Sequence, residues 1–77
     1  MTVTLYSGPA CPYCLIVKRF LNANGVDYRE IDISKDPVGK AGMEKLSGQT
    51  RVPVVDAGGE LVVGYNIKKL KKALRLQ

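Results

Sequence analysis

The chain has 77 residues, of which 45% are hydrophobic, and it carries 12 basic side chains, 7 acidic side chains, two cysteines and no histidine. A chain of this length is expected to form one small domain, residues 1–77. That size excludes a large multi-site enzyme. The absence of histidine excludes Ser-His-Asp and Cys-His catalytic sets, and two cysteines alone cannot complete a four-ligand metal site.

The first part of the chain predicts a strand, a helix and a second strand. Residues 2–6 alternate apolar and polar side chains, as a half-buried strand does, and Ser7-Gly8-Pro9 ends that pattern. Helical spacing follows over residues 12–24, and Asn24-Gly25 is a typical helix end. Residues 26–33 predict a second strand whose interspersed charges suit the edge of a sheet.

A second helix is predicted next, because Asp36 and Pro37 match an N-cap and a first helical residue. It runs toward Leu46, and its two glycines, Gly39 and Gly42, each weaken it by about 1 kcal/mol relative to alanine.

The last third of the chain predicts a hairpin and a final helix. The hairpin joins residues 54–56 to residues 60–63 through the turn Ala57-Gly58-Gly59. The helix runs from about Asn66 to the end, with one apolar and one basic face. The order βαβαββα predicts an α/β fold in which three helices pack on a four-stranded mixed sheet.

The segment Cys11-Pro12-Tyr13-Cys14 lies where the first strand has ended and the first helix begins. Pro12 at the first helical position makes Cys11 the N-cap, so unpaired N–H groups and the positive end of the helix dipole face its sulfur. Such placement lowers the pKa of a cysteine from about 8.5 to roughly 3.5–7.5. We therefore predict Cys11 as the catalytic nucleophile and Cys14, one turn further on, as the resolving thiol of a dithiol–disulfide exchange.

Other interpretations of these side chains stay open. The cysteine pair is otherwise a structural disulfide or part of a metal site. A disulfide across only two intervening residues would restrict the unfolded chain little. Tyr13 either shields the pair and offers its ring to a partner or is a surface aromatic residue without a role.

The Cys-Pro-Tyr-Cys motif, the Val52-Pro53 step before the hairpin and Gly64 before the last helix resemble the glutaredoxins over nearly the whole chain. The resemblance implies a thioredoxin-like fold in which Pro53 is cis and lies beside Cys11, although the sequence alone also permits a trans proline. It implies disulfide-containing proteins as partners, glutathione as reductant or co-substrate and no tightly bound cofactor. The residues expected to bind substrate are Pro12, Tyr13, Arg51, Val52, Pro53, Gly64, Tyr65 and Asn66.

Some positions depart from the glutaredoxin pattern. Many glutaredoxins have a glutathione-binding lysine three residues before the first cysteine, where this chain has Gly8. Arg51 either replaces that charge or is a solvated loop residue. Residues 63–66, Val-Gly-Tyr-Asn, are more similar to the glutaredoxin-like electron donors of ribonucleotide reductase, which take electrons from thioredoxin reductase. The sequence therefore leaves the reductant open between glutathione and thioredoxin reductase.

The predicted function is a glutaredoxin-like thiol-disulfide oxidoreductase. The alternative is an iron–sulfur carrier that dimerises around a cluster through Cys11 and glutathione, which Pro12 disfavours because glutaredoxins that hold clusters stably tend to lack it.

The basic face of the last helix is either solvated or steers an acidic protein partner, and no nucleic-acid-binding motif is present. No apolar run approaches the roughly 20 residues that span a bilayer, and the first ten residues do not match a signal peptide. We therefore expect a cytoplasmic monomer with no membrane or nucleic-acid partner.

Overall fold

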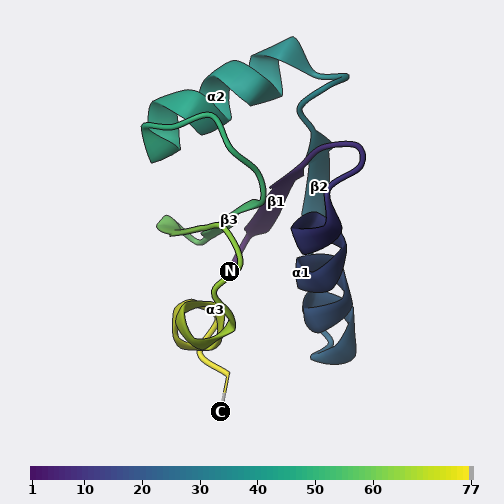
Figure 1. Ribbon diagram of the computed structural model, residues 1–77. Coiled ribbons are helices and arrows are strands. Elements are labelled where there is room, and N and C mark those ends of the chain that lie inside the picture. Colours follow the sequence, from purple (N-terminus) through teal and green to yellow (C-terminus); the bar gives the residue numbers. More distant parts are fainter. Residues whose placement is uncertain (77) are drawn as a thin grey trace.

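The computed structural model describes residues 1–76 and contains the predicted succession of strands and helices (Figure 1). In chain order these are β1 (Val3–Ser7), α1 (Pro12–Ala23), β2 (Arg29–Asp32), α2 (Pro37–Ser47), β3 (Val54–Ala57), β4 (Glu60–Val63) and α3 (Ile67–Ala73).

The four strands form one mixed sheet in the order β2-β1-β3-β4. β1 and β2 run parallel, with Thr4 opposite Arg29, because α1 carries the chain back across the sheet between them. β3 runs antiparallel to both β1 and β4. The predicted α/β fold with a four-stranded mixed sheet and three helices is confirmed, and β2 lies at a sheet edge as its charges predicted.

The helices cover both faces of the sheet and divide the core in two (Figure 1). On one face Met43 of α2 is fully buried and packs with Tyr6 and Val54. On the other face α1 and α3 pack on the strands through a larger buried cluster, which comprises Val3, Leu5, Val17, Leu21, Val55, Ala57, Val62, Leu70, Ala73 and Leu74. Full burial of one large aliphatic side chain contributes about 1.5–3 kcal/mol, so this cluster holds α1 and α3 firmly on the same face.

β2 is shorter than the predicted strand, because residues 26–28, after the turn at Asn24-Gly25, do not pair with the sheet. The backbone N–H of Val26 donates to the carbonyl oxygen of Leu21 over 3.0 Å and is therefore not available to the sheet. Val26 and Tyr28 instead pack on the larger core cluster.

The hairpin turn is tighter than predicted, since Ala57 pairs with Glu60 and leaves only Gly58 and Gly59 between the strands. Both glycines have positive φ, 63° and 101°, which a two-residue hairpin turn favours.

α3 ends at Ala73, whereas the helix was predicted to continue to the end of the chain. Arg75 has a left-handed φ of 58°, and the N–H of Leu76 donates to the carbonyl oxygen of Lys71 over 2.8 Å. Together with the bond from Arg75 N–H to the Lys72 carbonyl, this is a Schellman end, which lets Leu76 pack on the core. Residue 77 of the predicted helix lies outside the described residues.

Candidate active site

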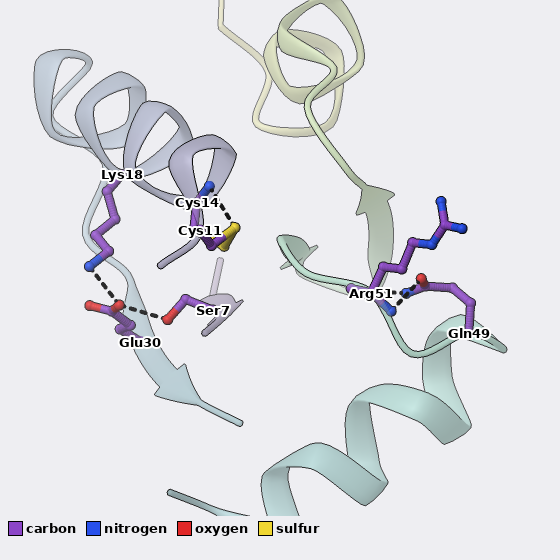
Figure 2. Close-up of a disulfide and its surroundings, with 7 residues drawn as sticks. All are labelled: Ser7, Cys11, Cys14, Lys18, Glu30, Gln49 and Arg51. Atoms are coloured by element: carbon purple, nitrogen blue, oxygen red, sulfur yellow. Dashed lines mark hydrogen bonds and ion pairs between the residues drawn. A yellow bond between two sulfur atoms is a disulfide. The ribbon is translucent and has the colours of Figure 1, made fainter. Parts of the chain in front are cut away.

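Cys11 is the N-cap of α1, as predicted. Its backbone is extended, with φ −112° and ψ 99°, and Pro12 is the first helical residue. The backbone N–H of Cys14 donates to Cys11 Sγ over 3.2 Å (Figure 2). Ala10 just before it has a left-handed φ of 51°, which turns the chain into the helix. The first turn of α1 therefore directs a backbone N–H group and the positive end of the helix at this sulfur.

The two cysteines form a disulfide and differ in burial. Their Cα atoms are 5.3 Å apart. Cys14 is only 2% exposed and shares the buried side of α1 with Val17 and Leu21, whereas Cys11 is partly exposed. A partner molecule can therefore reach the sulfur of Cys11 more readily than that of Cys14.

The Val52–Pro53 peptide bond is cis, as the resemblance implied. Pro53 is fully buried, and its carbonyl oxygen accepts a hydrogen bond from Gly64 N–H over 2.8 Å. A Cβ atom placed on Gly8 would lie 3.4 Å from a methyl group of Val52. The loop that leads into Cys11 therefore packs beside the Val52–Pro53 step, and Gly64 is tied to the same step.

Tyr13 and Tyr65 stack on each other, with ring centroids 5.6 Å apart and an angle of 17° between the rings. Both rings remain more than half exposed, at 56% and 52%. The stack joins the start of α1 to the segment that precedes α3, so Tyr13 has a structural partner although its ring lies at the surface. A role of either ring in substrate binding stays a prediction.

Arg51 and Asn66 are held by local contacts. Gln49 bonds both backbone groups of Arg51: the Arg51 N–H donates to Oε1 over 2.7 Å, and Nε2 donates to the Arg51 carbonyl over 3.0 Å (Figure 2). The Arg51 side chain is exposed. Asn66 Oδ1 accepts the backbone N–H of Lys69 over 3.0 Å and so caps α3. Their predicted contacts with substrate stay predictions.

A pocket of about 600 Å³ borders both cysteines, and several of its residues were not predicted as site residues. It is lined by Gly8, Ala10, Cys11, Pro12, Cys14, Leu15 and Lys18. The signal for Lys18 was available, because it follows Cys14 by four residues and so lies on the same side of the helix.

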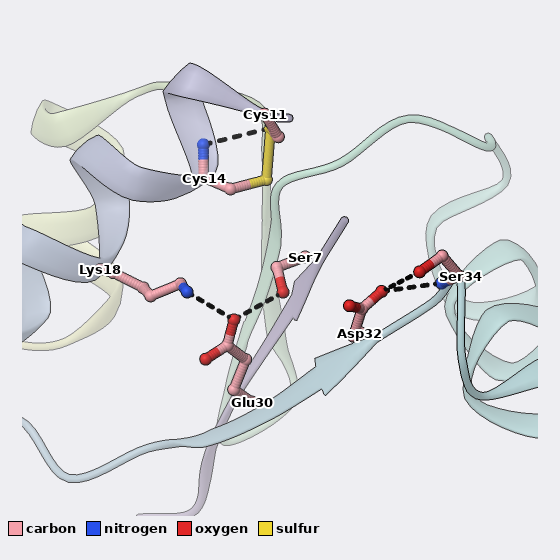
Figure 3. Close-up of polar contacts among 7 residues, drawn as sticks. All are labelled: Ser7, Cys11, Cys14, Lys18, Glu30, Asp32 and Ser34. Carbon is pink, nitrogen blue, oxygen red and sulfur yellow. Dashed lines mark hydrogen bonds and ion pairs between the residues drawn. A yellow bond between two sulfur atoms is a disulfide. The ribbon is translucent and has the colours of Figure 1, made fainter. Parts of the chain in front are cut away.

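Lys18 belongs to a polar cluster beside this pocket (Figure 3). Glu30 Oε2 accepts a hydrogen bond from the Ser7 hydroxyl over 2.7 Å and lies 2.8 Å from Lys18 Nζ. The hydrogen bond from Lys18, followed by that from Ser7, lowers the pKa of Glu30 below 4.5. The same contact with Glu30 raises the pKa of Lys18 above 10.5. At neutral pH both groups are therefore charged.

Within residues 1–76, no three His, Cys, Asp or Glu side chains lie close enough together to hold a metal ion. An iron–sulfur cluster on Cys11 would need its remaining ligands from outside this chain, so that alternative stays a prediction. Over the same residues, no helix is long and apolar enough to cross a bilayer.

Comparisons with known proteins agree with this geometry. A family model described as Glutaredoxin matches residues 3–62, which include Cys11, Cys14 and Pro53 and end before Gly64. A glutaredoxin of Neisseria meningitidis is 46% identical to this chain over 65 residues, which cover 83% of this chain and 76% of the relative.

Two solved structures extend the likeness to the whole fold. A thioredoxin-like protein has a TM-score of 0.89 at 36% identity, with 94% of this chain and 99% of that chain covered. The NrdH-redoxin of Escherichia coli, described as a glutaredoxin-like protein with a thioredoxin-like activity profile, has a TM-score of 0.80 at 27% identity. That alignment covers 100% of this chain and 96% of the other.

Proposed function

The chain belongs to the glutaredoxin family, and on that premise we propose that it is a thiol-disulfide oxidoreductase that reduces protein disulfides or glutathione mixed disulfides. The observation that carries the proposal is the position of Cys11 at the start of α1. This cysteine is partly exposed, and its sulfur accepts a hydrogen bond from the backbone N–H of Cys14. Helix-start placement favours a thiolate without a histidine base, and the burial of Cys14 beside Cys11 supports its role as the resolving thiol.

The reaction begins with both cysteines reduced. The Cys11 thiolate attacks one sulfur of the substrate disulfide, which forms a mixed disulfide and releases the other sulfur as a thiolate that takes up a proton. Cys14 loses its proton and attacks Cys11 Sγ, and the second substrate thiolate leaves. The substrate gains two electrons and two protons, and the chain is left with the Cys11–Cys14 disulfide. The backbone of the half-buried Val52 and the stacked tyrosines are the proposed docking edge.

The next cycle needs two electrons from a reductant. Glutathione and thioredoxin reductase are the two candidate sources. Arg51 is the exposed cation nearest in sequence to Val52–Pro53. We propose that it contacts a glutathione carboxylate, a role that a lysine at the position of Gly8 has in many glutaredoxins.

Activity of single-cysteine variants tests the proposal. We expect Cys11→Ser to lower the reduction of a protein disulfide and of bis(2-hydroxyethyl) disulfide to background, because no other cysteine is exposed. We expect Cys14→Ser to accumulate a mixed disulfide between Cys11 and a protein substrate, detectable by mass spectrometry. Full activity of Cys11→Ser would overturn the proposal.

The reductant is tested by counting free thiols in the oxidised protein after incubation with NADPH and one of two systems. Reduction by glutathione and glutathione reductase alone would identify a glutathione-dependent enzyme. Reduction by thioredoxin reductase alone would identify a thioredoxin-like electron donor. An Arg51→Gln variant that slows only the glutathione arm would support the proposed role of Arg51, whereas an unchanged rate would contradict it.

A further inference from the structure

The outer face of α3 is entirely basic. Residues 61–76 contain no Asp or Glu, and all five of their cationic side chains are exposed: Lys68, Lys69, Lys71, Lys72 and Arg75. Leu70 and Ala73 are buried on the opposite side of the helix, which fixes this orientation. In the part of the chain that the structure describes, the only ion pair joins Lys18 to Glu30. No carboxylate side chain there neutralises the basic face of α3.

The opposite edge of the sheet has the opposite charge. Residues 26–36 hold four carboxylates against Arg29 and Lys35, a net charge of −2, of which the ion pair between Lys18 of α1 and Glu30 offsets one. This segment contains β2, which forms one edge of the sheet (Figure 1), whereas β4 forms the other edge and α3 packs against it. The molecule therefore has a charge asymmetry that orients an approaching charged partner.

The basic face directly follows the proposed docking edge in the chain. Tyr65 stacks on Tyr13 within the Cys11–Cys14 motif, and α3 begins two residues after Tyr65. Lys68 and Lys69 lie in the first turn of α3. A polypeptide segment bound with its cysteine at Cys11 can therefore pass over the stacked tyrosines and reach the cations of α3 within a few residues.

We propose that the outer face of α3, together with Tyr65, is a docking surface for an acidic segment of the protein whose disulfide Cys11 reduces. The identity of the partner as a disulfide-bearing protein rests on the proposed function, whereas the acidic character of its segment rests on the charge of α3. Opposite charges raise the rate of encounter, and dissolved salt weakens that effect.

A protein segment fits this surface better than a nucleic acid does. Four of the five cations lie on a seven-residue helix, about 10 Å long at 1.5 Å per residue, and Arg75 lies just beyond its end, so the surface can neutralise few phosphates. The nearby rings of Tyr13 and Tyr65 stack on each other, so they do not offer two separate platforms for nucleic-acid bases.

Single-turnover reduction of matched peptides tests the docking surface. Two peptides carry the same internal disulfide, flanked by four glutamates in one and by four glutamines in the other. The fully reduced protein is mixed with each peptide, so that no reductase limits the rate. We expect the glutamate peptide to react about tenfold faster at low salt, the lower end of the range that electrostatic steering provides. The difference should vanish at 0.5 M NaCl, where the screening length is only about 4 Å.

Two triple variants with the same net charge of +2 provide the comparison, since each removes three of the +5 charges. Lys68→Gln/Lys71→Gln/Lys72→Gln removes charge from α3 and should lose most of the preference for the glutamate peptide. Lys35→Gln/Lys40→Gln/Lys45→Gln removes exposed charge from α2 and the turn before it, on the other face of the sheet, and should keep the preference. Both should reduce the glutamine peptide at the wild-type rate.

Binding of redox-inert peptides, with serine in place of each cysteine, separates the two proposals. A wild-type protein that binds the glutamate peptide but reduces neither disulfide peptide would contradict the proposed function and support the surface. Equal rates and equal binding for the two peptides, or equal losses in the two triple variants, would overturn the surface. Tighter binding to a single-stranded DNA oligomer or to phosphatidylserine vesicles than to the glutamate peptide at the same salt would also overturn it.

Discussion

Glu30 is the residue that joins β2, β1 and α1 beside the cysteine pair. Its carboxylate accepts a hydrogen bond from the Ser7 hydroxyl and forms an ion pair with the Lys18 ammonium. The pKa of Glu30 is lowered, chiefly by the hydrogen bond from Lys18, so its contribution to stability is present above pH 4.5 and is lost as the pH falls through the folded-state pKa. The pKa of Lys18 is raised, so its contribution is present below pH 10.5 and is lost as the pH rises through the folded-state pKa.

We predict that Glu30→Gln lowers the free energy of unfolding at pH 7 by about 1 kcal/mol or less, the usual range for a solvent-accessible ion pair. The difference from the wild type should shrink as the pH falls below 4.5 and through the lowered pKa of Glu30, because the wild-type carboxylate then becomes protonated. Urea unfolding of the two proteins at several pH values measures it. Asp27→Asn removes an exposed carboxylate outside this cluster and serves as the control. A difference that stays as large as at pH 7 when the pH is lowered below 4.5 would contradict the role of Glu30.

α2 shows how packing overrides helix propensity at the scale of one element. The sequence predicted that both of its glycines weaken the helix, yet their surroundings differ. A Cβ atom on Gly39 would lie 2.6 Å from Ile31 Cγ2 and 3.0 Å from the Asp36 carboxyl group, whereas Gly42 has nothing within 4 Å. The Gly39 N–H also donates to Asp36 Oδ1 over 2.8 Å, which caps the helix. Gly39 is therefore required for the close approach of α2 to β2.

We predict that Gly42→Ala raises the free energy of unfolding by up to about 1 kcal/mol, the difference in helix propensity. Gly39→Ala should lower it by roughly 1–3 kcal/mol, the usual cost of overpacking, because Ile31 or the cap must shift. Thermal unfolding of the two variants beside the wild type measures both effects. Equal stabilisation by the two substitutions would show that Gly39 does not limit the packing of α2.

For the whole molecule, the features that depend on neighbours in sequence were predictable. The order of elements, the parallel pairing of β1 with β2 and the N-cap position of Cys11 all follow from local patterns and the handedness of the crossover. The cis state of Pro53 followed only from the resemblance to glutaredoxins.

Contacts between distant segments were not predictable. Ser7 and Glu30 are 23 residues apart and meet only because β1 and β2 pair, and Tyr13 meets Tyr65 only once α1 and the segment before α3 are both in place on the sheet. Their side chains carry no periodic signal that would reveal such partners. β2 begins later than predicted because the N–H of Val26 is bonded to the carbonyl oxygen of Leu21, a contact that sequence periodicity does not encode.

The central claim is that Cys11 is the reactive thiolate of the reduced protein, and its alkylation by iodoacetamide as a function of pH tests that claim most directly. Peptide mass spectrometry assigns the modified cysteine at each pH. We predict that Cys11 reacts first and that its rate is half-maximal at a pH below about 8.5, because the start of α1 lowers the pKa of its thiol. Faster alkylation of Cys14, or equal rates for both cysteines with a midpoint near pH 8.5, would contradict the account.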